Sequence, residues 1–387
     1  MSKVSFKLSI SGWSVDSSSD ARTELLELET LSAVGSPAGS CRVVVYAPPK
    51  PKPSLLEQAA GAALSEVGLG GGNGAGSSKK VSTEIRGQKV SVGDKVSLEL
   101  TSGDKSGTVM TTELRSIQSS LGETVISGRT GGHRLATTRV NQVYQNQSAR
   151  QIATDIASQA GVDAGDMDDG STYPYFVVHE SRNAWEQVRE LAMRDGLDAY
   201  FDDDNHLTLK KFQKTTPDHT LYYGIDVLDL DLLRVEPSSE HVFIYGESPS
   251  SNTGSDTWYW MTKDLQPFRG EAGHGVRMLT FSDSAIRTKD GSAACAAAKY
   301  GAIEDGSTMG RLRLLGDPTI RLGDSIEIKN VANPDLNGVF KVISVRHVYN
   351  KFEGFTTVVG FSGKGGADQA GGALGQLAGA LAGAVGL

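Results

Sequence analysis

Two stretches of this 387-residue chain share one pattern: QKVSVGDKVSLEL at residues 88–100 and PTIRLGDSIEIKN at residues 318–330. Each places a Gly-Asp turn, Gly93-Asp94 or Gly323-Asp324, between two short segments in which apolar and polar residues alternate. Alternation with a period of two is typical of a strand with one buried face. Each stretch therefore predicts two short antiparallel strands joined by a tight turn.

The similarity extends beyond these turns. A second and a third glycine precede further strand-like segments in both copies, Gly107 and Gly122 in the first and Gly338 and Gly354 in the second. The separation between the copies is nearly the same at all three glycines. Chance similarity between glycine-punctuated hairpins is the alternative, because such hairpins are common. We interpret the pattern as two related β units of five or six strands.

Upstream of the turns the two copies are also parallel. Residues 25–31 and 41–46 are strand candidates in the first copy, and residues 228–235 and 241–245 take the same order in the second. An insertion is expected at the same point of each copy. The first, residues 47–80, is rich in proline and glycine, as linkers are; the second, residues 248–317, contains an alanine-rich helix near residues 292–303.

A different kind of sequence separates the copies. Residues 148–159 predict a helix, residues 175–179 a strand, and Asn183 with Glu186 a capping box that starts a second helix. Gly196 is expected to end that helix, and a hairpin follows it. The segment therefore predicts a compact α+β module.

Bulk composition excludes several classes of function. The formal net charge is -8, which argues against a protein that binds nucleic acid through phosphate contacts. Cys41 and Cys295 fit no metal-ligand spacing and are expected to be buried thiols. No secretion signal and no apolar run long enough to span a membrane is found, so synthesis and assembly in the cytoplasm are expected.

No pattern indicates catalysis, a metal site or a cofactor. The glycine run at 68–76 lacks the Gly-Lys-Ser/Thr of a phosphate-binding loop, and the acidic residues at 163–169 lack the register of a calcium loop. The acidic residues 202–204 stand where a hairpin turn favours them. We therefore expect no enzymatic activity, no cofactor and no metal.

Two segments carry a family resemblance. NQSARQIATDIASQAGV with YFVVHESRNAWEQVRELAMRDGLDAYFDDDNHLTLKKF resembles the middle module of the phage late control D family of tail proteins. GDPTIRLGDSIEIKN with LNGVFKVISVRHVYNKFEGFTTVVGF resembles the last β domain of that family. The two segments cover about half of the chain. The family includes baseplate hubs of contractile phage tails and the N-terminal part of type VI secretion spike proteins.

The resemblance implies a mainly β protein with an α+β part, in which two related tube-type β-barrel domains flank a small α+β module. The implied boundaries are 1–139 for the first barrel, 140–212 for the module, 213–362 for the second barrel and 363–387 for a Gly/Ala-rich tail. It further implies a homotrimer whose six barrels surround a channel. Such a ring would match a hexameric inner tube protein to a trimeric spike, because each chain offers two similar docking surfaces.

The implied partners are the inner tube protein, a spike protein, other baseplate components and, in the channel, a tape-measure protein, DNA or effectors. The particle is a virion or a related contractile injection device. Fused spike proteins continue into a needle after the hub, whereas the resemblance here stops near Gly363, so we expect the spike to be a separate chain.

Six residues are candidates for contact with partners. They are aromatic residues of the second insertion, or leucines of the C-terminal tail at helical spacing: Trp258, Tyr259, Trp260, Leu374, Leu377 and Leu381. The aromatic residues could instead cover the second β unit, and the tail could be disordered. Two other functions remain open: a cell-wall-binding or wall-cleaving module with a LysM-like segment at residues 148–159, and a tail tip protein outside the central ring.

Overall fold

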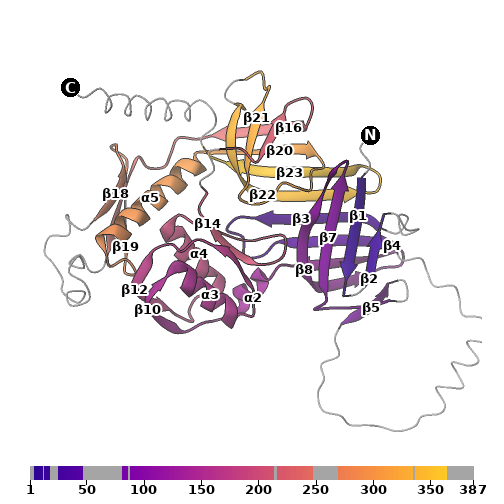
Figure 1. The fold of residues 1–387 in the computed structure, drawn as a ribbon, viewed down its shortest axis with the longest axis horizontal. Helices are drawn as coiled ribbons and strands as arrows, with labels where there is room; N and C mark the ends of the chain where they lie inside the picture. The colour runs from indigo at the N-terminus through magenta and orange to yellow at the C-terminus, as the bar shows by residue number, and fades with distance from the viewer. Residues whose placement is uncertain are drawn as a thin grey trace, which may run out of the picture.

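The computed structural model describes residues 4–11, 13–17, 25–46, 81–85, 88–212, 216–246, 269–333 and 336–363. Within these residues the chain is mainly β with few helices, as the alternation predicted. The largest sheet has thirteen strands, and Figure 1 shows it running from the first β unit on the right to the second at the top. The described pairings form an open path and close no barrel.

The first β unit has the strand order β3-β4-β9-β8-β7-β1-β2, all antiparallel. Its strands are β1 (Val4–Ile10), β2 (Trp13–Asp16), β3 (Leu25–Ala33), β4 (Ser40–Tyr46), β7 (Lys95–Ser102), β8 (Lys105–Ser119) and β9 (Glu123–Arg129). A separate hairpin, β5 (Ser82–Ile85) with β6 (Gln88–Ser91), precedes the Gly93-Asp94 turn. Alternate residues of these strands fill one core, in which Leu28, Leu98 and Leu100 are fully buried.

The second β unit repeats this arrangement in the order β16-β20-β23-β22-β21-β15. Its strands are β15 (His219–Tyr222), β16 (Val227–Arg234), β20 (Thr308–Leu315), β21 (Ser325–Lys329), β22 (Gly338–Asn350) and β23 (Gly354–Ser362). Its own core contains Phe340 and Phe361, whose ring centroids lie 4.7 Å apart. The units differ at one end, since β15 pairs with β21 in parallel whereas β1 pairs with β7 antiparallel.

One expected strand correspondence is wrong. Residues 241–245 form β17 (His241–Gly246), which pairs with β18 (Gly270–Gly273) and β19 (Met278–Asp283) and not with β16. The strand that stands where β4 stands in the first unit is β20. Both segments are short and apolar, so alternation could not separate them. The second insertion therefore lies between β16 and β20, whereas the first follows β4.

The middle module contains the elements that the sequence predicted. α3 (Ala149–Gln159) and α4 (Ala184–Asp195) pack over the strand pair β10 (Gln142–Ser148) and β12 (Thr172–Val178) and the sheet of β11 (Ala164–Met167), β13 (Asp198–Phe201) and β14 (Leu207–Lys210). The capping box of Asn183 with Glu186 is present, and Gly196 ends α4 with φ of 68°. A short helix, α2 (Gly132–Thr137), leads into this module from β9.

The insertion of the second unit is a layer of its own. The predicted alanine-rich helix is α5 (Lys289–Gly306), which packs on the three-stranded sheet of β17, β18 and β19, at the left in Figure 1. Arg194 of α4 forms a two-pronged ion pair with Asp283 of β19, at 2.7 and 3.2 Å, and so joins the insertion to the middle module. No helix among the described residues is long and apolar enough to cross a bilayer.

Candidate assembly surfaces

The two β units meet strand to strand. β3 of the first unit pairs antiparallel with residues 344–350 of β22, from Ala33 opposite Ser344 to Glu27 opposite Asn350. Arg346 Nε donates to Glu29 Oε1 across this joint at 2.8 Å. β22 is thus shared between the two units. Along one edge, its first residues pair with β21 of the second unit and its last residues pair with β3 of the first unit.

Side chains of the second unit also enter the core of the first. The ring centroid of Tyr349 lies 5.3 Å from that of Phe6, and Phe355 is buried in the same core. His347 is buried beside them, and its Nδ1 lies 3.1 Å from Thr357 Oγ1. Burial lowers the pKa of His347 to about 4, which the nearby Asp317 opposes only in part. The buried part of the internal joint therefore holds apolar side chains and a neutral His347, while the Arg346–Glu29 ion pair lies at its surface.

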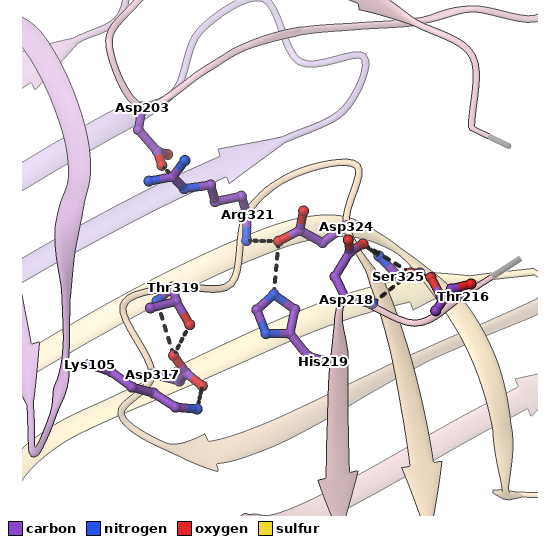
Figure 2. Close-up of polar contacts among 10 residues, drawn as sticks. All are labelled: Lys105, Asp203, Thr216, Asp218, His219, Asp317, Thr319, Arg321, Asp324 and Ser325. Atoms are coloured by element: carbon purple, nitrogen blue, oxygen red, sulfur yellow. Dashed lines mark hydrogen bonds and ion pairs between the residues drawn. The ribbon is translucent and has the colours of Figure 1, made fainter. Parts of the chain in front are cut away.

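A polar junction, drawn in Figure 2, connects the second unit to the middle module. Arg321 Nε lies 2.8 Å from Asp203 Oδ2 in the β13–β14 turn, while the backbone N–H of Arg321 donates to Asp324 Oδ2 at 2.8 Å. The same Asp324 oxygen lies 3.0 Å from His219 Nε2 of β15. Asp324 belongs to the Gly-Asp turn that the sequence singled out, so this turn holds β15 and the β20–β21 loop together.

The polar junction also reaches the first unit. Lys105, at the start of β8, donates to Asp317 Oδ2 at 2.5 Å, and Thr319 donates twice to the other oxygen, at 2.6 and 3.0 Å. Burial alone would raise the pKa of Asp317, but these hydrogen bonds outweigh it and the pKa lies below its usual value. The Asp317 carboxylate therefore stays ionised near neutral pH, and its contact with Lys105 joins the two units.

A groove of about 270 Å³ lies beside the polar junction, between Asp202, Asp203, Asp204 and Arg321. Burial raises the pKa of Asp203 to about 7, and the neighbouring carboxylates add to the rise although Arg321 opposes it. The described residues contain no group of three side chains placed to hold a metal ion. The Asp202 carboxylate accepts hydrogen bonds within the turn and that of Asp203 pairs with Arg321, so the arrangement fits structural support.

Several strand edges of the large sheet have no strand partner among the described residues, including the outer edges of β2 and β15. Two others are the outer edge of β16, which ends the sheet, and the edge of β8 at residues 115–119, beyond its pairing with β7. Exposed apolar side chains accompany both edges: Leu228 and Leu233 on β16, and Leu121 at the tip of the β8–β9 hairpin. Unpaired edges with apolar side chains are sites where another chain adds a strand.

The six contact candidates named from the sequence, including Trp258 and Leu374, lie outside the described residues. Sequence reasoning missed the two free edges. The repeat held a signal for them, since residues 25–31, LLELETL, have a counterpart at residues 227–233, VLDLDLL. Only the pairing of β3 with β22 shows that this repeated strand is a joint.

The fold as a whole is similar to that of solved tail proteins. A tail protein from Neisseria meningitidis MC58 gives a TM-score of 0.63 at 12% identity, covering 93% of this chain and 96% of that one. The 43 kDa tail protein of prophage MuSo2 from Shewanella oneidensis gives 0.61 at 12% identity, covering 92% and 97%.

A third match is the E. coli c3393 protein, a component of the type VI secretion system described as structurally similar to the T4 bacteriophage tail proteins gp27 and gp5. It gives a TM-score of 0.53 at 11% identity and covers 93% of this chain and 77% of that one. No protein-family model matches the sequence, and neither does any curated protein. At these identities the likeness establishes the architecture: the chain has the fold of phage tail proteins.

Proposed function

We propose that the chain is a structural component of a phage tail or a related contractile injection particle, and that it serves there as the baseplate hub. The observation that carries this proposal is the duplication. Two β units of one strand order are joined edge to edge within a chain that matches tail proteins over nearly its whole length.

Duplication has a consequence for symmetry. A ring of three chains would present six similar β units in a circle, and also three identical middle modules and insertions. Such a ring can meet a six-fold inner tube protein on one face and a three-fold spike protein on the other, with every contact between copies satisfied. The role is therefore adaptor-like and non-enzymatic, with a channel through which a tape-measure protein, DNA or effectors pass.

The native mass of the purified chain tests this proposal. A trimer of the 40.9 kDa chain has a mass of about 123 kDa, three times 40.9, and electron-microscope class averages should show six lobes around a hole. The measurement is repeated in the presence of candidate tube and spike proteins. A chain that stays monomeric in every mixture is not a hub, and glycan binding or clearing of cell-wall suspensions would then support the wall-binding function.

A further inference from the structure

We infer that copies of this chain join by pairing residues 115–119 of β8 in one copy with β16 of the next, in the antiparallel arrangement that β22 and β3 form within the chain. This inference deepens the proposed hub function and rests on it. It names the strands, the register and the side chains of the joint between copies.

Residues 113–119 of β8 are the counterparts of residues 341–347 of β22. Gly93 N donates to Leu114 O and Leu114 N to Asp94 O, both at 2.8 Å. In the second unit Gly323 N donates to Val342 O at 3.2 Å and Val342 N to Asp324 O at 2.8 Å. Leu114 therefore corresponds to Val342, because each makes the same pair of hydrogen bonds to its Gly-Asp turn.

The irregularities of the two strands support this correspondence. The register of β8 with β9 shifts between Leu114 and Ser116, and that of β22 with β23 shifts between Val342 and Ser344. A β-bulge is a specific feature of a strand, so a bulge at matching positions fixes the alignment. Residues 116–119 of β8 hence stand where residues 344–347 of β22 stand.

β16 of the second unit is the counterpart of β3 in the first. The register of β3 with β4 shifts between Leu25 and Glu27, and that of β16 with β20 shifts between Val227 and Asp229. Leu25 therefore corresponds to Val227, and Glu27 to Asp229. The acidic residues that alternate with leucine in the two strands fall in the same register.

The strand edges of the internal joint and their counterparts differ in burial. Residues 344–347 of β22 pair with β3, and only Arg346 among them is exposed, whereas three of the four counterparts on β8, namely Ser116, Gln118 and Ser119, are exposed. Likewise Leu28, which follows Glu27 in β3, is fully buried, while Leu230, which follows Asp229 in β16, is only half-buried. Each edge of the internal joint thus has a counterpart at which the partner is missing among the described residues.

Apolar side chains near the tips of the two hairpins also differ in burial. Tyr349 at the β22–β23 tip packs on Phe6 in the first unit. The β8–β9 hairpin is shorter beyond Ser119, and Leu121 in its turn is 96% exposed. A leucine this exposed has nothing to pack on within the described part of the chain, and a joint like the internal one would carry it onto the β16 side of the next copy.

The internal pairing supplies the register of the joint between copies. Ser344 opposite Ala33 becomes Ser116 opposite Val235, and Arg346 opposite Leu31 becomes Gln118 opposite Leu233. The joint uses two different surfaces of each copy, so it is head-to-tail and repeats until a ring closes. In a ring of three copies, three joints between copies would alternate with three internal joints, which gives six joints in all.

Disulfide trapping tests the register. The double variant Gln118→Cys/Leu233→Cys is oxidised mildly and separated on a non-reducing gel, since two cysteines can bond only when their Cα atoms lie within about 7 Å. We expect crosslinked dimers and trimers. The matched control is Gln118→Cys/Asp229→Cys, in which the second cysteine is exposed but about 13 Å out of register, from about 3.3 Å per strand residue. The native thiols of Cys41 and Cys295 are buried and should stay unreacted.

The Leu121→Ser variant supplies a second measurement. It should weaken self-association roughly tenfold or more, because an apolar side chain of this size is lost from the joint, without changing the circular dichroism of the monomer. Val276→Ser, 88% exposed in the β18–β19 loop, is the control and should leave self-association unchanged.

A trimer in which the in-register pair does not crosslink, or crosslinks no better than the control, overturns this inference and leaves the hub intact. A chain that forms no oligomer with any partner overturns the proposed function together with it.

Discussion

The buried His347 should make the stability of this protein depend on acid. The pKa of His347 falls from 6.5 to about 4 in the folded chain, because the ring is buried in the joint between the β units. The folded chain therefore binds fewer protons than the unfolded chain between these two values. Stability contributed by the neutral ring is complete above pH 6.5 and is lost as the pH falls from 6.5 towards 4.

The magnitude follows from the shift. A difference of about 2.5 pKa units corresponds to about 3.4 kcal/mol at ~1.4 kcal/mol per unit, of which about 2.5 kcal/mol is lost by pH 4.5. The variant His347→Gln keeps a polar group near Thr357 but cannot bind a proton in this range. It should be less stable than the wild type at pH 7.5, and its disadvantage should shrink by about 2.5 kcal/mol at pH 4.5.

Urea unfolding followed by circular dichroism at the two pH values measures this difference. Carboxylates that also titrate contribute equally to both proteins and cancel in the comparison. His274→Gln, a substitution at an exposed histidine, is the control and should follow the wild type at both values. If His347→Gln and the wild type lose the same free energy between pH 7.5 and 4.5, the assignment of His347 as a buried neutral group is refuted.

Two further predictions concern the polar junction and the entry to the middle module. The pKa of Asp203 rises from 3.8 to about 7, so its ionisation costs stability as the pH rises through that window. Between pH 4 and 8 in urea unfolding, Asp203→Asn should gain stability relative to the wild type, by at most about 4 kcal/mol at ~1.4 kcal/mol per pKa unit, because the folded pKa already includes the attraction of Arg321. Gly132→Ala should lower stability by about 2 kcal/mol or more, because its Cβ would lie 1.4 Å from Pro37 O, whereas Gly301→Ala in α5 meets nothing within 4 Å and should raise the thermal midpoint.

Much of the local structure was predictable because it depends on neighbouring residues. The Gly-Asp turns, the capping box of Asn183 with Glu186, the end of α4 at Gly196 and the hairpin after it are all present. These elements follow from backbone preferences and short-range hydrogen bonds, which a sequence states directly.

The correspondence of strands was harder to predict because it depends on pairing across long distances. Matching Gly107 with Gly338 would align Leu114 with Val345, whereas the hydrogen bonds to the Gly-Asp turns align it with Val342. Glycines mark turns whose length varies between copies, so they drift relative to the strands. β17 was misplaced for a related reason: it follows β16 in sequence, but its pairing partners β18 and β19 come later in the chain.

The free edges were outside the reach of the sequence because an edge is defined by the absence of a neighbour. Alternation predicts one buried face for β16 whether or not a strand pairs with it. The duplication supplies the missing information. The pairing of β3 with β22 is completed within the chain, so it shows which strand partner the counterpart edges of β16 and β8 lack among the described residues.

The two kinds of joint differ in one respect that bears on how a ring of these chains would respond to acid. The position of His347 at the internal joint is taken by Ser119 at the inferred joint between copies, in the alignment that matches Val342 with Leu114. Among the described residues of the two joints, only the internal one therefore contains a buried group that titrates between pH 4 and 6.5. Acid should loosen the contact between the two units of one chain before it separates the chains, so a ring would distort while its mass stays that of the trimer.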